Sequence, residues 1–431
     1  MKRNQEQPMK TKETRPVRRG MPDFQLLILT LLLVGFGLIM VYSSSASIAL
    51  VSEDYNNDAL YFTKRQVVFA ILGVIGMFVA MNIPFAKYKQ LYIPLFLLTI
   101  ILLLAVLVVG VEINNAKSWF SLGPMNLQPS EIAKISLILY LSALITKKGE
   151  RFRDLRTGYI PVMIIVGFVA GLIMLQPDFG TTFILVATCG LIIYAGGASM
   201  KHIMGSIGLL VVGAGIVIGA KYLIDLMTGS TSGNSGSYQL ARFTSFLNPF
   251  SDPTNSSYNL LHSLTAIGQG GLTGTGIGQG VIKLHYLPNA FNDFIFAVIG
   301  EELGLIGTIL FLGVYVYFIW RGFIIALRCK DSFGTLVGVG IMGLIAIQAF
   351  INIGGVTQTI PVTGVTLPFI SYGGTSLLIT MASIGIMLSI SRENNLDQPQ
   401  ERVKSVRTIT EEQRTSPALV NRKAQKRTTS K

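Results

Sequence analysis

Charge and cysteine are both scarce in this chain of 431 residues. Asp, Glu, Lys and Arg make up 13% of it, against roughly 25% in a typical soluble domain. The two cysteines lie in or beside apolar runs, which excludes a disulfide framework and a Cys-based metal site. The three histidines are scattered and predict no metal cluster. Half of the residues are hydrophobic and the mean hydropathy is +0.56, so the composition indicates a polytopic membrane protein.

Ten apolar stretches are long enough to cross a bilayer. A hydrocarbon core about 30 Å thick requires about 20 apolar residues in a helix. The stretches are continuous and show no alternating polarity, which favours helices over barrel strands. We therefore expect an all-α polytopic membrane protein with about ten transmembrane helices in a membrane domain at 24–391. The predicted spans are 24–43, 66–83, 90–111, 131–147, 159–175, 180–197, 203–224, 294–320, 335–353 and 370–391.

Lys and Arg are distributed unevenly around these spans. With the N-terminus assigned to the cytoplasm, 28 of the 35 Lys and Arg fall on the cytoplasmic side, whereas Asp and Glu divide 11 and 11. The positive-inside rule then predicts a multi-pass protein of the cytoplasmic membrane with both termini cytoplasmic. The polar tails 1–23 and 392–431 carry +4 and +5 of the net charge of +13, and we expect them to be disordered. Anionic lipid headgroups suit such tails, whereas nucleic acid is not expected because no folded basic module accompanies the charge.

A long extracytoplasmic loop, about 225–293, separates the seventh and eighth spans. Loops of this length are often functional. Within it, residues 260–267 have the pattern of a short amphipathic helix, and residues 268–280 (GQGGLTGTGIGQG) contain seven glycines. Such glycines allow backbone amides to approach a ligand, and they equally suit a flexible or tightly packed hinge at the membrane surface. The pattern does not match the dinucleotide fingerprint because no strand precedes it.

Asp293 closes this loop and opens the eighth span, beside Phe291 and Phe294. A partly desolvated carboxylate at the outer membrane boundary suits a general base. The alternative role is an N-cap of the helix. Glu301 and Glu302 follow at about 12–14 Å greater depth. A charge at that depth requires a partner or nearby water, so these two residues are either ligands or carboxyls hydrogen-bonded between helices.

Further polar groups lie at the outer ends of other spans. Gln128–Glu131 (QPSE) opens the fourth span with an early Pro, a possible Ser cap and a Glu in the first turn. Gln176–Gly180 (QPDFG) breaks the chain between the fifth and sixth spans, and 363–376 enters the tenth span as a broken or re-entrant helix does. Lys117 and Trp119 add a cation and an interfacial ring, for which membrane anchoring is the alternative role. Together these groups favour a lipid-borne or extracytoplasmic substrate.

The motifs resemble those of the SEDS (shape, elongation, division and sporulation) family. NAKSWF, QPSE, QPDFGT, LTAIGQGG, GTGIGQG, DFIFAVIGEELG and TGVTLPFISYGGTS occur in the family's order over about 24–391. The segment 248–253 (NPFSDP) and the long polar tail are more similar to the division and sporulation branch (FtsW, SpoVE) than to the elongation branch (RodA). Where the family commonly reads PEAHTDF or PESHTDF, residues 288–294 read PNAFNDF, which keeps the Asp but not the Glu and His.

This resemblance implies a peptidoglycan glycosyltransferase of division or sporulation. Such enzymes polymerise lipid II, an undecaprenyl-pyrophosphate disaccharide-pentapeptide, into glycan strands at the outer membrane face. The implied partners are the growing glycan strand, a class B penicillin-binding transpeptidase and other division or elongation membrane proteins. Cations or a divalent metal, Mg²⁺ or Mn²⁺, would balance the phosphates, and no nucleotide is needed because the donor is already activated.

The family's essential Asp maps to Asp293, which we expect to be the general base. Lys117, Arg242 and Lys283 are candidate phosphate or sugar contacts, and Lys64 and Arg65 are further cations. Candidate substrate-binding or cavity residues complete the expected site: Trp119, Glu131, Asp178 and Glu301.

Two other classes of function stay open. A lipid II flippase or another transporter would use carboxyls near the midplane such as Glu301 and Glu302, although the carboxyls cluster toward one face. A scaffold that recruits division proteins through its basic tails would not need Asp293. The sequence has no Walker loop, which argues against ATP-driven transport.

Overall fold

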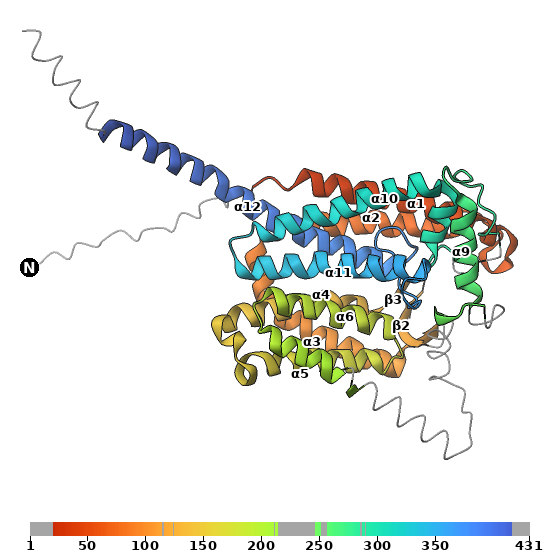
Figure 1. Ribbon diagram of the computed structural model, residues 1–431, viewed down its shortest axis with the longest axis horizontal. Coiled ribbons are helices and arrows are strands. Elements are labelled where there is room, and N and C mark those ends of the chain that lie inside the picture. The colour runs from red at the N-terminus through yellow and green to blue at the C-terminus, as the bar shows by residue number, and fades with distance from the viewer. Residues whose placement is uncertain are drawn as a thin grey trace, which may run out of the picture.

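The structure is a computed structural model, and it describes residues 20–113, 116–123, 125–210, 212–213, 246–250, 257–284, 287–288 and 290–415. Long helices in these residues run along a common axis, with the short helix α9 and a small sheet at one end (Figure 1). Residues 200–210 are helical as well. The helices are α1 (Phe24–Val51), α2 (Tyr61–Asn82), α3 (Phe85–Val109), α4 (Pro129–Lys148), α5 (Ile160–Met174), α6 (Phe179–Ala195), α9 (Tyr258–Gly270), α10 (Ile295–Leu327), α11 (Ser332–Val356) and α12 (Gly374–Thr415).

Eight of the described helical segments are long and apolar enough to cross a membrane, and α6 is a shorter apolar helix. Large apolar side chains on their outer surfaces are widely exposed, for example Val108 at 78%, Ile164 at 65% and Leu310 at 70%. A protein surface of this kind requires lipid rather than water around it. The expected all-α membrane architecture is thus confirmed. Residues 211 and 214–224 of the seventh predicted span, and much of the loop 225–293, lie outside the described residues.

A three-stranded antiparallel sheet precedes α4, and the sequence analysis did not anticipate it. Its strands are β1 (Val111–Ile113), β2 (Ala116–Leu122) and β3 (Met125–Leu127), in the order β1-β2-β3. Phe120 pairs with Leu127 in the register of β2 and β3. The segment between α3 and α4 is not helical, and the sheet gives its backbone N–H and C=O groups hydrogen-bond partners.

The segment between α11 and α12, residues 357–373, is not helical, as expected for a broken helix. It is held by contacts with the bundle. The Tyr315 hydroxyl donates to the Pro368 carbonyl at 3.3 Å, and a Cβ on Gly37 would lie 2.3 Å from the Phe369 carbonyl oxygen. The tenth span therefore begins at Gly374, later than the predicted residue 370.

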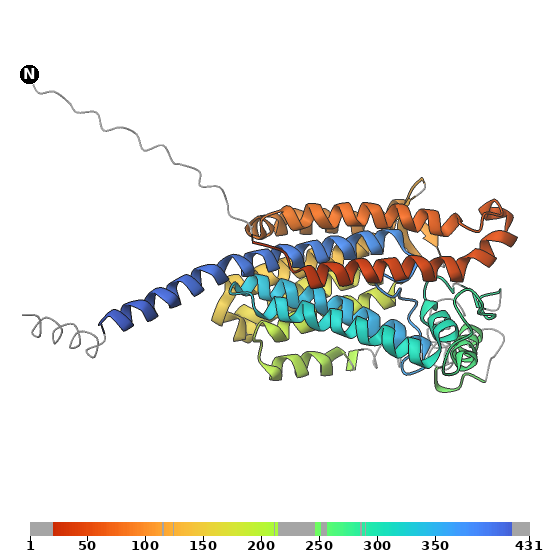
Figure 2. The same cartoon turned by 90° about the horizontal axis from the view of Figure 1, so that it is seen from above.

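The first and last helices meet at the end of the bundle opposite the sheet. Asp23, the N-cap of α1, accepts a hydrogen bond from Arg321 of α10, with 2.5 Å between Nη2 and Oδ2. Its backbone amide donates to the Ser391 hydroxyl of α12 at 3.0 Å. α1 therefore begins where α12 leaves the bundle (Figure 2).

The C-terminal tail corrects one expectation, because α12 continues to Thr415 where we expected disorder from residue 392. Its 42 residues span about 63 Å at 1.5 Å per residue, twice the thickness of a hydrocarbon core. Extending an existing helix avoids the cost of nucleation, and the tail is rich in good helix formers such as Glu, Gln and Arg. The tails at 1–19 and 416–431 lie outside the described residues.

Candidate active site

A cavity of about 300 Å³ lies at the end of the bundle that carries the sheet. This volume is at the lower end of the range of ligand pockets, about 300–1,000 Å³. Its wall combines α2, the sheet, α11, the 357–373 segment and the beginnings of several other helices. Its lining residues include Arg65, Trp119, Gln128, Glu131, Lys134, Asp178, Asp293, Gln348, Tyr372 and Gly374.

Four helices begin at this cavity. Gln128 is the N-cap of α4 and Asp178 is the N-cap of α6, and both line the cavity. Asp293 lies just before α10, and Gly374 is the first residue of α12. The N-terminus of a helix carries a partial positive charge and unpaired amides, so four of them around one space favour an anionic ligand.

Asp293 lines the cavity and is partly buried. The N-cap of α10 is Phe294, one residue after Asp293. Two contacts hold the backbone at Asp293 and at Phe291, two residues before it. The Asn352 side-chain amide donates to the Asp293 carbonyl at 2.7 Å and to the Val365 carbonyl at 2.7 Å. The Tyr372 amide donates to the carbonyl of Phe291 at 2.9 Å.

A buried ion pair forms one wall of the cavity. Lys134 and Glu131 of α4 lie 2.9 Å apart between Nζ and Oε1, with side-chain exposures of 3% and 9%. The Lys134 ammonium also donates to Oε1 of Gln348 in α11 at 3.4 Å. We expected Glu131 in the site but did not single out Lys134. The sequence held a signal for it, namely a cation inside an apolar span, three residues after an acid on the same helix face.

The two Gln-Pro turns meet in the structure. The Gln128 side-chain amide donates to Oδ2 of Asp178 at 3.1 Å, while Oδ1 of Asp178 accepts from the Thr181 amide at 3.0 Å. Capping therefore explains Asp178, and its second oxygen joins α4 to α6. Ser130, the other expected cap, has a buried hydroxyl without a hydrogen-bond partner in the described chain.

Arg65 and Tyr372 form the wall near α2. The Arg65 guanidinium lies over the Tyr61 ring, 4.8 Å from its centroid. Burial raises the pKa of the Tyr372 phenol, and the nearby Arg65 guanidinium offsets part of this increase. The phenol therefore stays neutral near neutral pH and can donate a hydrogen bond.

The structure does not bring every expected site residue to the cavity. Lys117, two residues before Trp119 on β2, donates to the Val108 carbonyl at 3.0 Å and is not among the residues that line the cavity. Lys283 and Glu301 belong to a separate buried network. Arg242 lies outside the described residues.

The side chains of the cavity indicate whether it could bind the expected divalent cation. In the part of the chain that the structure describes, no three His, Cys, Asp or Glu side chains lie together as a metal site. Glu131 and Asp178 already bond to Lys134 and Gln128. The described carboxylates do not fit a dedicated metal centre, and the cation stays a prediction.

Comparison with known proteins places the chain in a family. Residues 24–396 match the family model of the cell cycle proteins FtsW, RodA and SpoVE. Stage V sporulation protein E of Bacillus subtilis is 42% identical over 378 residues, which cover 87% of this chain and 98% of that protein. A probable peptidoglycan glycosyltransferase FtsW of Trichlorobacter lovleyi is 38% identical over 379 residues, covering 88% and 95%.

The structural comparison gives the same family. A solved chain from a peptidoglycan synthase complex that coordinates polymerization and crosslinking aligns with a TM-score of 0.68 and 29% identity. The alignment covers 86% of this chain and 98% of that chain. These matches confirm the SEDS resemblance, and the chain belongs to the FtsW, RodA and SpoVE family of cell cycle proteins.

Proposed function

We propose that this protein is a peptidoglycan glycosyltransferase that polymerises lipid II at the outer face of the cytoplasmic membrane, with Asp293 as the general base. The activity is supported by the similar FtsW proteins, which bear the name of that enzyme. The observation that carries the site assignment is the cavity itself, in which Asp293 lies among the N-termini of four helices.

The chemistry requires a base beside a strongly anionic leaving group. A sugar hydroxyl of one lipid-linked substrate attacks the anomeric carbon of the other. As the new glycosidic bond forms, the bond from that carbon to the lipid pyrophosphate breaks, and the hydroxyl proton passes to the Asp293 carboxylate. The lipid pyrophosphate departs with the bonding electrons. General base catalysis of this kind contributes typically about 10²–10⁴-fold to a rate.

The cavity supplies positive charge that can stabilise the pyrophosphate leaving group. The four helix N-termini present partial positive charge, and Arg65 adds a full cation at the wall. Lys134 contributes less net charge because Glu131 neutralises it. Positive groups that are fixed before the reaction stabilise charge that develops on the leaving group.

Other residues of the cavity have proposed supporting roles. Trp119 offers an aromatic face to a sugar ring, and Glu131 and Asp178 shape the polar wall. We further propose that the chain works with a class B transpeptidase, because a similar chain is part of a peptidoglycan synthase complex. Both termini are proposed to be cytoplasmic, which places the cavity on the outer side.

The transport alternative rested on Glu301 and Glu302, and both carboxylates have local partners in the structure. Glu301 accepts from the backbone amides of Val281 and Ile282, and Glu302 pairs with Lys283. The two functions are separated by incubating the purified protein with lipid II, with and without its transpeptidase and a divalent cation. Glycan ladders on a gel support the enzyme. Lipid II that crosses liposomes without forming polymer contradicts it.

A further inference from the structure

The glycine-rich segment forms backbone hydrogen bonds with α10 at a break in that helix. The helix is interrupted at Gly304, where φ is 64° and ψ is −170°. In a continuous helix the amides four residues after Glu301 and Glu302 would donate to the carbonyls of these two residues. Here backbone groups of residues 271–276 form hydrogen bonds with these amides and carbonyls instead. The four bonds join Leu305 to Gly271, Ile306 to Leu272, Thr275 to Glu301 and Gly276 to Glu302, at 2.9, 3.1, 3.0 and 3.0 Å.

Close backbone approach explains several of the glycines. A Cβ on Gly270 would lie 2.1 Å from the Gly300 carbonyl oxygen, and a Cβ on Gly274 would lie 2.2 Å from the Glu302 carbonyl oxygen. Neither approach is possible with a side chain. The glycine-rich motif is therefore a tightly packed element at these positions, which was one of the two roles that the sequence left open.

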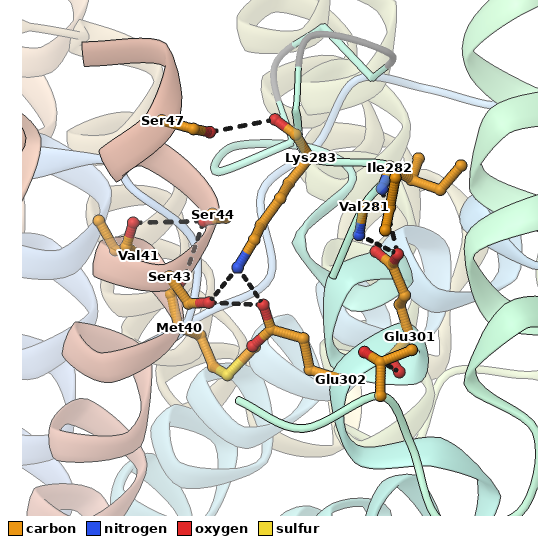
Figure 3. A network of polar contacts seen from close by, with 11 residues as sticks. Met40, Val41, Ser43, Ser44, Ser47, Val281, Ile282, Lys283, Glu301 and Glu302 are labelled. Carbon is orange, nitrogen blue, oxygen red and sulfur yellow. Dashed lines mark hydrogen bonds and ion pairs between the residues drawn. The ribbon is translucent and has the colours of Figure 1, made fainter. Parts of the chain in front are cut away.

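A buried polar network fastens the same region through side chains (Figure 3). The Lys283 ammonium lies 2.6 Å from Oε1 of Glu302, and both residues are almost completely buried. Ser43 of α1 bonds to each of them, donating to Glu302 at 2.5 Å and accepting from Lys283 at 2.9 Å. Next to this pair, Oε1 of Glu301 accepts from the amides of Val281 and Ile282 at 2.6 and 3.1 Å.

The Lys283–Glu302 pair closes a loop of the chain that contains Asp293. Residues 283 and 302 are 19 apart in sequence, and Asp293 lies midway between them. From Ile295 to Glu302 the chain rises about 10 Å along α10 at 1.5 Å per residue. The residues of α10 between these points are buried, from Ile295 through Gly300. The pair thus joins the two ends of this loop, and Asp293 lies about midway along the chain between them.

We propose that Lys283 and Glu302 are positioning residues: their buried ion pair fixes the ends of the loop that carries Asp293, and so sets the place of the Asp293 carboxylate in the cavity. Lys283 then acts without touching substrate, because its ammonium is committed to Glu302 and Ser43. A displacement of about 1 Å from a distant change can reduce a rate about 10²-fold. This inference rests on the proposed glycosyltransferase function.

The first test is a kinetic comparison of Lys283→Met and Glu302→Gln in lipid II polymerisation. Each single variant is expected to lower kcat about 10- to 100-fold, with KM within about twofold of wild type. Lys89→Met is the matched control, because Lys89 pairs with Asp331 at an exposed position. A raised KM with unchanged kcat for Lys283→Met would instead make Lys283 a substrate contact and overturn the proposal.

The double variant Lys283→Met/Glu302→Met separates positioning from stability. An apolar pair often replaces a buried ion pair without loss of stability. We therefore expect the thermal midpoint of the double variant to return toward the wild-type value while kcat stays low. Recovery of kcat together with the midpoint would show a role in stability alone and would overturn the positioning role.

Amide hydrogen exchange of the full-length protein tests, independently of activity, whether the ion pair anchors the segment 271–284. In Lys283→Met, amides of the segment 271–284 are expected to exchange faster than in wild type. In the control Lys89→Met, these amides are expected to exchange at the wild-type rate. Unchanged exchange in Lys283→Met would overturn the proposal. If wild-type protein makes no glycan, the proposed function fails, whereas the exchange result still decides whether the ion pair fastens the segment.

Discussion

The Glu131–Lys134 pair illustrates how single charges are accommodated inside this membrane domain. Each residue is almost completely buried, and each has the other as its partner, with Gln348 as a further acceptor for Lys134. The Lys283–Glu302 pair follows the same pattern in another part of the bundle. An unpaired charge at such depth has a high free energy. Removal of one partner therefore destabilises the protein, because it leaves the other charge buried without a partner.

Lys134→Met should therefore destabilise the protein. It leaves the Glu131 carboxylate buried beside the cavity without its cation, and breaking a buried pair in this way costs about 3–5 kcal/mol. The measurement is the thermal midpoint of unfolding in detergent. Lys147→Met, at the exposed end of the same helix, serves as the control. Equal midpoints for the two variants would contradict the importance of the pair.

Asn352→Leu should lower activity more than stability. The change removes the amide that joins the Asp293 carbonyl to the Val365 carbonyl, and with it a contact that fixes the backbone of the proposed general base. We expect kcat for lipid II polymerisation to fall about 10- to 100-fold. Thr357→Val is the control, since the Thr357 hydroxyl donates to its own helix at Ile353. Full activity of Asn352→Leu would show that this contact is dispensable.

Sequence patterns revealed individual site residues better than their partners. Asp293, Trp119, Glu131 and Asp178 line one cavity, and each stood out as a polar or aromatic residue at the end of an apolar run. Lys283 was expected as a phosphate or sugar contact, and its actual contact with Ser43 joins residues 240 apart in sequence. Such a contact depends on which helices pack together, and a single sequence does not contain that information.

At the scale of elements, the glycine-rich segment and α10 behave as one unit. The break at Gly304 is stable because residues 271–276 bond to the interrupted helix. Unsatisfied backbone groups at membrane depth would cost several kcal/mol each. The segment therefore replaces the missing helical hydrogen bonds, and its glycines make that replacement sterically possible.

Gly274→Ala should disrupt this unit, with Gly278→Ala as a closely matched control. Both glycines have a positive φ, 80° and 85°, so an alanine at either costs about 1–2 kcal/mol for the backbone conformation. A Cβ at Gly274 would also meet the Glu302 carbonyl at 2.2 Å, whereas a Cβ at Gly278 meets nothing within 4 Å. The thermal midpoint of Gly274→Ala should be clearly lower. Equal midpoints would contradict the close packing of the segment.

Long apolar helices were predictable to within several residues, because twenty consecutive apolar side chains have few alternatives to a membrane span. The short strands β1 and β3 were not, since three residues carry too little periodicity to identify. The insertion of residues 271–276 into α10 was equally hidden, because it depends on two elements meeting in space. The helical part of the C-terminal tail was missed because its polar composition resembles that of disordered segments.

At the scale of the whole molecule, the bundle has two chemically different ends. One carries the cavity, the sheet and α9, and the other carries the meeting point of Asp23, Arg321 and Ser391 (Figures 1 and 2). The distribution of Lys and Arg predicts that the second end is cytoplasmic. A lipid-linked sugar on the outer leaflet would then reach the cavity while its prenyl chain stays in the bilayer.

This orientation predicts which introduced cysteines react from outside the cell. In a variant without Cys189 and Cys329, a membrane-impermeant maleimide should label Ser121→Cys on β2 in intact cells. It should label Ser430→Cys, in the C-terminal tail, only after the membrane is opened. The reverse pattern would place the cavity on the cytoplasmic side and contradict the proposed orientation.

In the proposed mechanism the Asp293 carboxylate accepts a proton during glycan polymerisation. The most direct measurement is the rate at which purified Asp293→Asn converts lipid II into glycan chains, compared with wild type under the same conditions. An asparagine keeps the size of the side chain but cannot act as a base, so we expect the rate to fall about 10²–10⁴-fold with the thermal midpoint unchanged. Glycan chains formed by Asp293→Asn at the wild-type rate would contradict the account.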